Sequence, residues 1–233
     1  MKTVAVIPTW NEAKHIARVV VQTRRQVSAV LVTDDCSVDG TRNVAIECGA
    51  RVTTNTGERG YGSNIWHGIT HARKNLAPDV LVILDGDGQH DPGEIPLLLA
   101  PILAGSADVV MGCRTNGHGM PAYRRAGNRV LSFVCNVGSS QTFPDALSGF
   151  WAIRAGCVPA LTERKWGIAV ELLIKARAAG YRLGGVPVRP IYHDNYADNS
   201  TTTPLDLAWA LLRCIVKWRV KVEILSRNGK KAY

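Results

Sequence analysis

Short runs of aliphatic residues alternate with longer segments of helical periodicity through the first half of the chain. In a run such as Val80 to Leu84 every position is nonpolar, as in strands that are buried on both faces of a sheet. The predicted strands lie at 3–8, 29–33, 51–54, 80–84 and 107–111, and the predicted helices at 11–23, 41–48, 63–74 and 93–103. This alternation predicts an α/β fold with a parallel sheet and right-handed crossovers.

Local signals refine this pattern and extend it through the second half. We expect Thr9 or Asn11 to cap the first helix and Gly49 to end the second. A strand at 181–188 is predicted at a sheet edge because Pro187 lacks a backbone donor. The remaining predicted elements are helices at 121–132, 163–180 and 205–225 and a strand at 150–154.

The pattern divides the chain into two parts of unequal size. We expect a domain over residues 1–190, followed at 191–233 by a polar loop, a basic amphipathic helix and a tail. The helix at 205–225 has too many charges to span a membrane. It is suited to lying on anionic lipid, to packing against the domain or to contacting a partner subunit in a homo-oligomer.

Composition narrows the range of partners. The chain has 233 residues, 46% of them hydrophobic, so it is long enough for a sizeable core. Its formal charge of +9 favours anionic partners, but no aromatic-interleaved basic array indicates nucleic acid. The six cysteines have no zinc spacing and no signal peptide is visible, so we expect reduced thiols in a cytoplasmic protein, with peripheral membrane contact left open.

The strongest chemical signal follows the strand at 80–84. There the chain reads Asp85-Gly86-Asp87-Gly88-Gln89, two acids and an amide separated by glycines. Oxygen ligands at this spacing suit a divalent cation that also holds phosphate oxygens, although solvated aspartates in a turn would have the same pattern. A calcium EF-hand loop is excluded because His90 and Pro96 occupy its glycine and glutamate positions.

Two further strand ends carry polar residues, at 10–12 and 34–39. In an open α/β sheet, ligands bind at the carboxyl ends of the strands, so a nucleotide laid along this edge would meet all three segments. The glycines at 57–62 form only a weak dinucleotide motif, and no phosphate-binding GxxxxGK[ST] motif is present.

Six motifs occur in an order that is similar to one enzyme family. They are IPTWNE at 7–12, DDCSVDGT at 34–41, GYGSN at 60–64, LDGDGQHDP at 84–92, GCR at 112–114 and DALSGFWAIR at 145–154. Together they resemble family 2 glycosyltransferases of the GT-A fold, in particular the dolichyl- or polyprenyl-phosphate mannosyl- and glucosyltransferases. The resemblance covers about residues 3–190 and implies a Rossmann-like, mostly parallel sheet flanked by helices.

The resemblance also implies roles for individual residues. Asp87, Arg114 and Glu171 would be catalytic, and Mg²⁺ or Mn²⁺ would be held by Asp85, Asp87 and Gln89. The matched nucleotide-sugar contacts are Pro8, Trp10, Glu12, Asp35, Asp85, Gly86 and Asp87. Arg114 would face the phosphates, where it and the cation would neutralise charge on the leaving nucleoside diphosphate.

The acceptor side is less sharply defined. Arg125 and Arg129 share a helix face at i, i+4 and, with Ser148, would bind an acceptor phosphate, unless they form a solvated basic face. Glu171 is either a general base or an ion-pair partner of Lys175. The chain departs from the family pattern in two places. Trp151 stands where the family has an arginine, and in the polar loop, where the family has an arginine or lysine, only His193 could supply a positive charge.

These features predict an inverting, metal-dependent glycosyltransferase. It would move a hexose from a nucleoside-diphosphate sugar, GDP-mannose or UDP-glucose, to a polyprenyl or dolichyl phosphate. One alternative keeps the donor chemistry with a soluble hydroxyl acceptor and Glu171 or Asp145 as base. Another is a non-catalytic nucleotide-binding module, whereas a nucleotidyltransferase would need a basic glycine-rich loop that TWNEAKHI does not supply.

Overall fold

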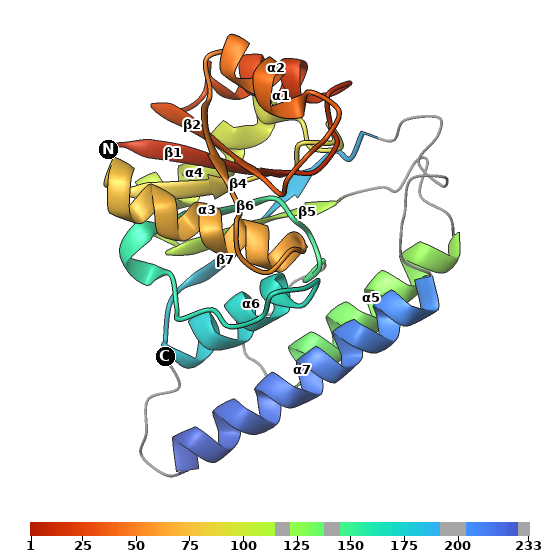
Figure 1. Cartoon of the computed structure of the whole chain (residues 1–233). Helices are drawn as coiled ribbons and strands as arrows, with labels where there is room; N and C mark the ends of the chain where they lie inside the picture. Colours follow the sequence, from red (N-terminus) through yellow and green to blue (C-terminus); the bar gives the residue numbers. More distant parts are fainter. Residues whose placement is uncertain (115–121, 138–144, 192–203, 228–233) are drawn as a thin grey trace.

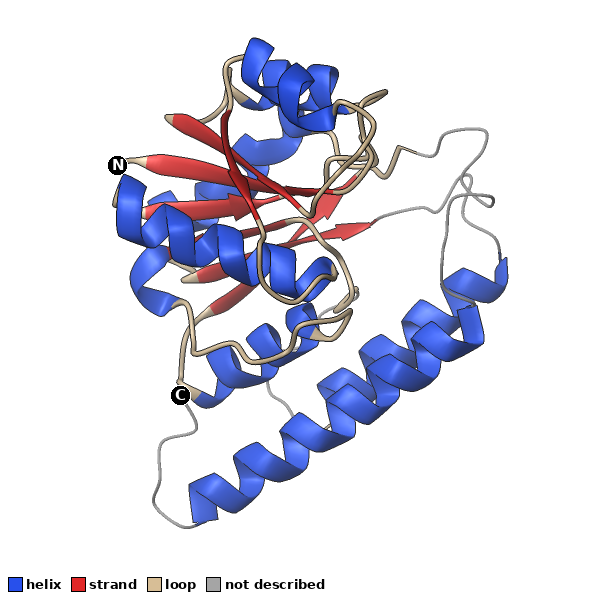
Figure 2. Ribbon diagram, viewed as in Figure 1, coloured by secondary structure: helices blue, strands red, loops and turns tan. Residues whose placement is uncertain are grey.

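Strands with nonpolar residues on both faces form the middle layer of the protein, and helices cover both sides of this sheet (Figure 1, Figure 2). The computed structural model describes residues 1–114, 122–137, 145–191 and 204–227, and only the backbone at 122–124, 204–207 and 223–227. The strands are β1 (Thr3–Thr9), β2 (Ala29–Asp34), β3 (Arg51–Thr54), β4 (Val80–Ile83), β5 (Val109–Arg114), β6 (Trp151–Arg154) and β7 (Leu183–Val188).

The seven strands pair in the order β3-β2-β1-β4-β6-β5-β7. All pairs are parallel except those of β6, which runs antiparallel between β4 and β5. The sequence pattern predicted each of these strands, but it did not predict that β6 lies between β4 and β5 and runs antiparallel to them. The sheet is therefore mostly parallel, and β7 lies at its edge, as Pro187 predicted.

The helices form two groups, one on each side of the sheet. They are α1 (Ile16–Thr23), α2 (Thr41–Glu47), α3 (Tyr61–Leu76), α4 (Ile95–Leu103), α5 (Ala122–Asn136), α6 (Ile168–Ala178) and α7 (Pro204–Arg227). Val4 and Val6 of β1 face the core that contains α3, α5, α6 and α7, whereas Ala5 and Ile7 face α1, α2 and α4. The twofold side-chain alternation of a strand thus fills both cores.

The C-terminal helix α7 packs against α5 and α6 rather than standing apart from the domain (Figure 1). One side of it is buried, through Leu211, Cys214, Ile215 and Trp218. This packing is one of the arrangements that its amphipathic pattern predicted. Within the described part of the chain, no helix is long and nonpolar enough to cross a membrane.

The predicted cap of the first helix is wrong. Helix α1 begins only at Ile16, after a turn, and His15 at its start makes no side-chain cap. Asn11 instead has a positive φ of 56°, and its side-chain oxygen accepts a hydrogen bond from the Val38 amide at 2.9 Å. Asn11 therefore connects two loops at the end of the sheet. Gly49, by contrast, follows α2 with a φ of 85°, as its predicted role at a helix end requires.

Candidate functional site

The carboxyl ends of β1, β2, β4 and β5 meet at one edge of the sheet, and the antiparallel β6 brings its preceding residues to the same edge. A methyl group on Gly149, which lies just before β6, would come within 2.8 Å of the Asp85 carboxylate and 2.7 Å of the Tyr61 hydroxyl. Residues that are far apart in sequence are therefore in contact here. The three polar strand ends converge as predicted.

Asp35 is held at the end of β2 by two donors. Its side chain is buried, and it accepts hydrogen bonds from the Asn55 side-chain amide and the Gly60 backbone amide, each at 2.9 Å. Gly60 has a φ of 136°, which favours glycine and lets the chain turn into α3 with its amide directed at the carboxylate. This fixes the acid that the resemblance assigns to the nucleobase or ribose.

The segment after β1 is tied to the segment after β2. The backbone amides of Asn11, Glu12 and Ala13 donate to the side chains of Ser37, Thr41 and Asp39 at 2.8 to 3.0 Å. These bonds leave the Trp10 side chain 52% exposed beside the edge, while Pro8 is buried inside β1. An exposed indole is suited to stacking on a planar ring.

Asp85 lies among side chains that restrict both its position and its charge. It accepts a hydrogen bond from the Tyr61 hydroxyl at 2.9 Å. The Asp85 backbone amide donates to Nδ1 of His90 at 3.2 Å, so this ring nitrogen is unprotonated. Burial, followed by the positive charge of Arg114, lowers the pKa of His90 to about 3, and the ring stacks on Phe150. His90 is thus a neutral support for Asp85.

Carboxylates crowd together at this point. Burial and then the charge of Asp87 raise the pKa of Asp85 to about 8. Burial, Asp87 and then Asp39 raise the pKa of Glu12 to about 7. Gly86 is buried, and an added methyl group would meet Thr9 at 2.5 Å, so the backbone between the acids is tightly packed.

A divalent cation fits this group of acids, because oxygen donors with unfavourable mutual repulsion gain most from a bound positive charge. The Asp87 carboxylate accepts a hydrogen bond from the backbone amide of Gln89 at 2.9 Å, which fixes the turn that contains both residues. Among the described residues, no three His, Cys, Asp or Glu side chains form a complete metal site.

Arg114 extends from the end of β5 and forms a two-pronged ion pair with Asp145. Its Nε and Nη2 atoms donate to the two carboxylate oxygens at 2.5 and 2.9 Å. Its charge affects the pKa of both Asp85 and His90, so it lies near the acids. The sequence predicted Arg114 at this edge but not its pairing with Asp145.

The residues predicted on the acceptor side are not brought together. Arg125 and Arg129 are exposed on α5, on one side of the helix as the i, i+4 spacing predicted. Ser148 is fully buried and accepts a hydrogen bond from the Phe150 amide at 3.3 Å. Trp151, which stands where the family pattern has an arginine, is also fully buried and donates to the Ser148 carbonyl. His193 lies outside the described residues.

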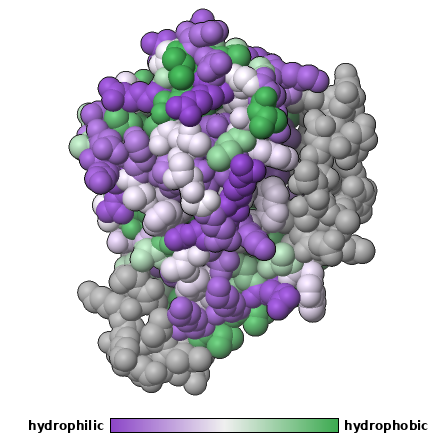
Figure 3. Space-filling model, viewed as in Figure 1, coloured by the Kyte–Doolittle hydropathy of each residue, from purple (hydrophilic) through white to green (hydrophobic). Residues whose placement is uncertain are grey.

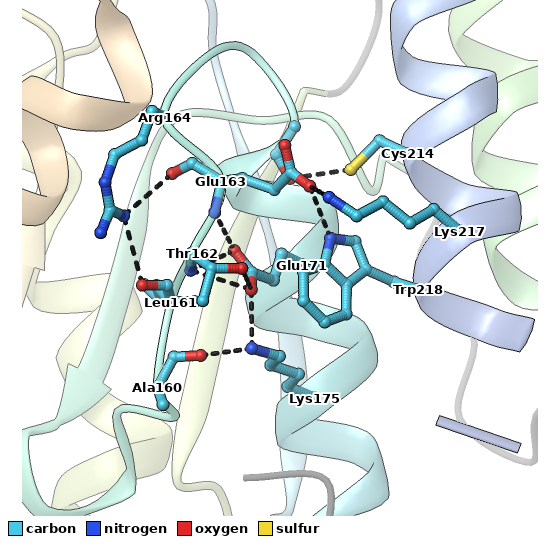
Figure 4. Close-up of polar contacts among 11 residues, drawn as sticks. Ala160, Leu161, Thr162, Glu163, Arg164, Glu171, Lys175, Cys214, Lys217 and Trp218 are labelled. Carbon is cyan, nitrogen blue, oxygen red and sulfur yellow. Dashed lines mark hydrogen bonds and ion pairs between the residues drawn. The ribbon is translucent and has the colours of Figure 1, made fainter. Parts of the chain in front are cut away.

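Glu171 lies at the start of α6 in a separate polar cluster (Figure 4). It is completely buried and accepts hydrogen bonds from the Thr162 hydroxyl and from the amides of Thr162 and Glu163, at 2.6 to 2.9 Å. Lys175 pairs with it at 2.7 Å and also donates to the Ala160 carbonyl. The ion pair predicted from the i, i+4 spacing is therefore present, but in the interior instead of on the helix surface.

The segment 160–167 connects this cluster to two other parts of the molecule. Toward α7, the Glu163 carboxylate accepts from Lys217 at 2.6 Å and from the Trp218 indole at 2.9 Å (Figure 4). Toward the sheet edge, the Arg164 carbonyl accepts from the Ser63 amide at 2.8 Å. The Trp166 ring stacks on Tyr61 with centroids 5.0 Å apart. One short segment therefore contacts both α7 and the residue that supports Asp85.

Several residues at the site were not singled out from the sequence. Tyr61 holds the partly buried Asp85, Asn55 holds the buried Asp35, and Trp166 supports Tyr61. Tyr61 lies inside the GYGSN motif, which was the one available signal, whereas nothing in the local pattern around Asn55 or Trp166 indicates a contact with the site.

A mostly parallel sheet flanked by helices, with acids and an arginine at its carboxyl edge, defines an α/β protein of the kind that binds ligands at this edge. The family model "Glycosyl transferase family 2" matches residues 4–158, which include the strands β1 to β6 except for the first residue of β1. The chain belongs to glycosyl transferase family 2. It is a glycosyltransferase with the GT-A fold.

Two curated relatives illustrate the likeness. The UDP-N-acetylglucosamine–dolichyl-phosphate N-acetylglucosaminyltransferase of Methanococcus voltae is 28% identical over 213 residues, which cover 80% of this chain and 84% of the relative. The dolichol-phosphate mannosyltransferase of Pyrococcus furiosus is 30% identical over 193 residues, covering 76% of this chain and 53% of the relative. The chain thus spans about half of the second protein.

A solved structure with the same fold is glucosyl-3-phosphoglycerate synthase from Mycobacterium tuberculosis, in complex with Mn²⁺, UDP and glucosyl-3-phosphoglycerate. It matches with a TM-score of 0.70 at 22% identity, covering 98% of this chain and 80% of that one. At this identity the likeness establishes the fold.

Proposed function

We propose that the protein transfers a hexose from a nucleoside-diphosphate sugar to a polyprenyl or dolichyl phosphate, with inversion at the anomeric carbon. The observation that carries this proposal is the crowding of Glu12, Asp85 and Asp87 beside Arg114 at the carboxyl edge of the sheet. Both sugar-transferring relatives act, by their names, on dolichol or dolichyl phosphate.

The donor site combines the three strand ends. Trp10 and the fixed Asp35 would hold the nucleoside, with the indole against the base and the carboxylate on a base or ribose hydroxyl. Asp85, Asp87 and Gln89 would hold Mg²⁺ or Mn²⁺, which when bound would neutralise charge on the diphosphate. Arg114 would add a second positive charge on exchanging part of its contact with Asp145 for a phosphate.

A phosphate acceptor needs no strong general base, because the attacking oxygen is already anionic at neutral pH. This requirement agrees with Glu171, whose carboxylate is occupied by Thr162, Glu163 and Lys175. We assign Glu171 to holding the 160–167 segment in place. The acceptor phosphate would be gathered by Arg125 or Arg129, which are exposed and carry positive charge on α5.

Donor turnover tests the proposal. With Mn²⁺ present, purified protein is offered GDP-mannose, UDP-glucose or UDP-N-acetylglucosamine, with and without a short polyprenyl phosphate, and released nucleoside diphosphate is measured. We expect release that depends on the lipid phosphate for one donor, together with a glycolipid product. Equal turnover without the lipid, or transfer only to a soluble hydroxyl compound, would assign a different acceptor. No binding of any donor would refute the donor site.

The raised pKa values of Glu12 and Asp85 predict a pH dependence of metal binding. Their carboxyls carry protons in the metal-free protein up to about pH 7 and 8, so a cation must displace these protons. We expect Mn²⁺ affinity to rise about tenfold or more between pH 6 and 8, with proton release on binding. Calorimetry in buffers of different ionisation enthalpy measures both, and an affinity that is constant over this range would contradict the prediction.

The same raised pKa values make the metal-free protein less stable as the pH rises, whereas its affinity for Mn²⁺ increases. The folded metal-free protein binds protons on these carboxyls that the unfolded chain has lost, since the ordinary pKa values are 4.5 for Glu12 and 3.8 for Asp85. Their contribution to the free energy of unfolding is therefore present below about pH 4 and decreases as the pH rises toward 8. Added Mn²⁺ should restore stability at the upper end of this range.

A further inference from the structure

Helices α5 and α7 carry large nonpolar side chains that no described residue covers. We call this surface the outer face. Its members are Val130 and Phe133 of α5, Val137 directly after the last turn of α5, and Trp209, Val216 and Val220 of α7, all of them between 49% and 70% exposed.

Helical spacing puts each set on a single side of its helix. The two α5 residues and Val137 follow at i, i+3 and i+7, and the α7 residues at i, i+7 and i+11. The opposite sides are buried, at Leu131 and Cys135 on α5 and at Ile215 and Trp218 on α7, among others. Each helix therefore has one nonpolar side in the core and a second one turned outward.

The two exposed sides are continuous. The Arg219 guanidinium of α7 donates to the carbonyl oxygens of Val134 on α5, at 3.0 Å, and of Val137 directly after it. Arg177 of α6 donates to the Cys135 carbonyl at 3.1 Å, and α6 also packs against α7. Figure 1 shows α5 and α7 side by side and running in the same direction. The outer face is the side of both helices that is turned away from α6.

Positive charge borders this nonpolar surface. Helix α5 contains no acidic residue, and neither does α7 between 208 and 222. The exposed cations on the two helices include Arg125, Arg129, Arg213 and Lys221. In Figure 3, hydrophobic and strongly hydrophilic residues lie next to each other along the lower edge of the molecule, where α7 runs.

We propose that the outer face binds the surface of an anionic lipid bilayer. The nonpolar side chains would enter the boundary between headgroups and acyl chains, with both helices parallel to the membrane plane and the cations on lipid phosphates. A second copy of this chain fits less well, because pairing two such faces would bring arginines and lysines of the same sign together. The proposal concerns binding alone and does not depend on which donor or acceptor the enzyme uses.

Vesicle flotation tests the proposal with vesicles of phosphatidylcholine containing 30% phosphatidylglycerol. We expect the full-length protein to float with these vesicles at low salt and much less with phosphatidylcholine alone. Phe133→Glu should lower the partition coefficient about tenfold, and Arg213→Glu about fivefold or more. Both side chains are exposed, so the folded state should persist, which circular dichroism and the melting temperature would check.

Leu103→Glu is the matched control, since Leu103 is 63% exposed but lies on α4, on the other side of the sheet from α5 and α7. It should leave vesicle binding unchanged. The proposal is wrong if the parent protein does not bind anionic vesicles, or if Phe133→Glu and Leu103→Glu bind equally well. It is also wrong if light scattering shows a dimer that Phe133→Glu converts to monomer without any vesicle binding by either form.

Discussion

Replacement of Asp87 by alanine is expected to lower sugar transfer by about 10³-fold while leaving the protein folded. Asp87 is half-buried in the turn after β4, and its charge is the largest electrostatic influence on both Asp85 and Glu12 after burial itself. Removal of this carboxylate takes away a proposed metal ligand. It also leaves less negative charge to attract a cation to the site.

The comparison that isolates this effect is Asp91→Asn. Asp91 lies four residues further along the same loop and accepts a hydrogen bond from the Gly93 amide at 2.8 Å, which an asparagine oxygen would preserve. We expect activity within about twofold of the parent and an unchanged melting temperature. Initial rates at saturating Mn²⁺, together with Mn²⁺ titrations of both variants, are the measurements. An active Asp87→Ala variant with normal Mn²⁺ affinity would remove Asp87 from the metal site.

Replacement of Glu171 by alanine is expected to destabilise the protein by about 3–5 kcal/mol. The change would leave the Lys175 ammonium, which is 4% exposed, without its carboxylate, and two backbone amides without their acceptor. Chemical denaturation followed by fluorescence gives the free energy of unfolding. A double replacement, Glu171→Leu with Lys175→Met, should recover part of the loss, because it removes both charges from the interior but still leaves the two backbone amides without their acceptor.

The Glu171→Gln variant separates this supporting role from general base catalysis. A glutamine retains the shape and can still accept from the Thr162 amide, but it cannot take up a proton. If Glu171 only holds the 160–167 segment, kcat should fall by less than about tenfold and keep its pH profile. A loss of 10³-fold in kcat with near-normal stability and donor affinity would instead identify Glu171 as the base, and would favour a hydroxyl acceptor.

The sequence predicted the fold well because its central strands are largely nonpolar and are followed by polar or charged residues. The carboxyl ends of parallel strands share an edge, so Asp35, Asp85 and Asp87 could be placed together without coordinates. The spacing of Glu171 and Lys175 likewise predicted their pairing. In both cases the contact is determined by the spacing of residues within one helix or by the parallel connection of successive strands, and both can be seen in the sequence.

Contacts between distant segments could not be predicted in this way. The bond from Tyr61 to Asp85 depends on how α3 packs against the sheet, and the pairing of Arg114 with Asp145 depends on where β6 enters the sheet. Asn11 is of a residue type that often caps helices, but its side-chain oxygen accepts a hydrogen bond from the Val38 amide in a neighbouring loop instead. The complete burial of Ser148 was likewise not apparent from the sequence, which indicated only a loop before a strand.

The position of β6 has a consequence for synthesis of the chain. β5 is bordered by β6 and β7, both of which follow it in sequence, and β4 lacks its second neighbour until β6 is made. While the ribosome adds the residues between Arg114 and Arg154, three strand edges in the middle of the future sheet therefore have no partner. Unpaired edges invite pairing with other chains. These edges become paired only when β6 and β7 have been added, so the sheet is most open to pairing with other chains during this interval.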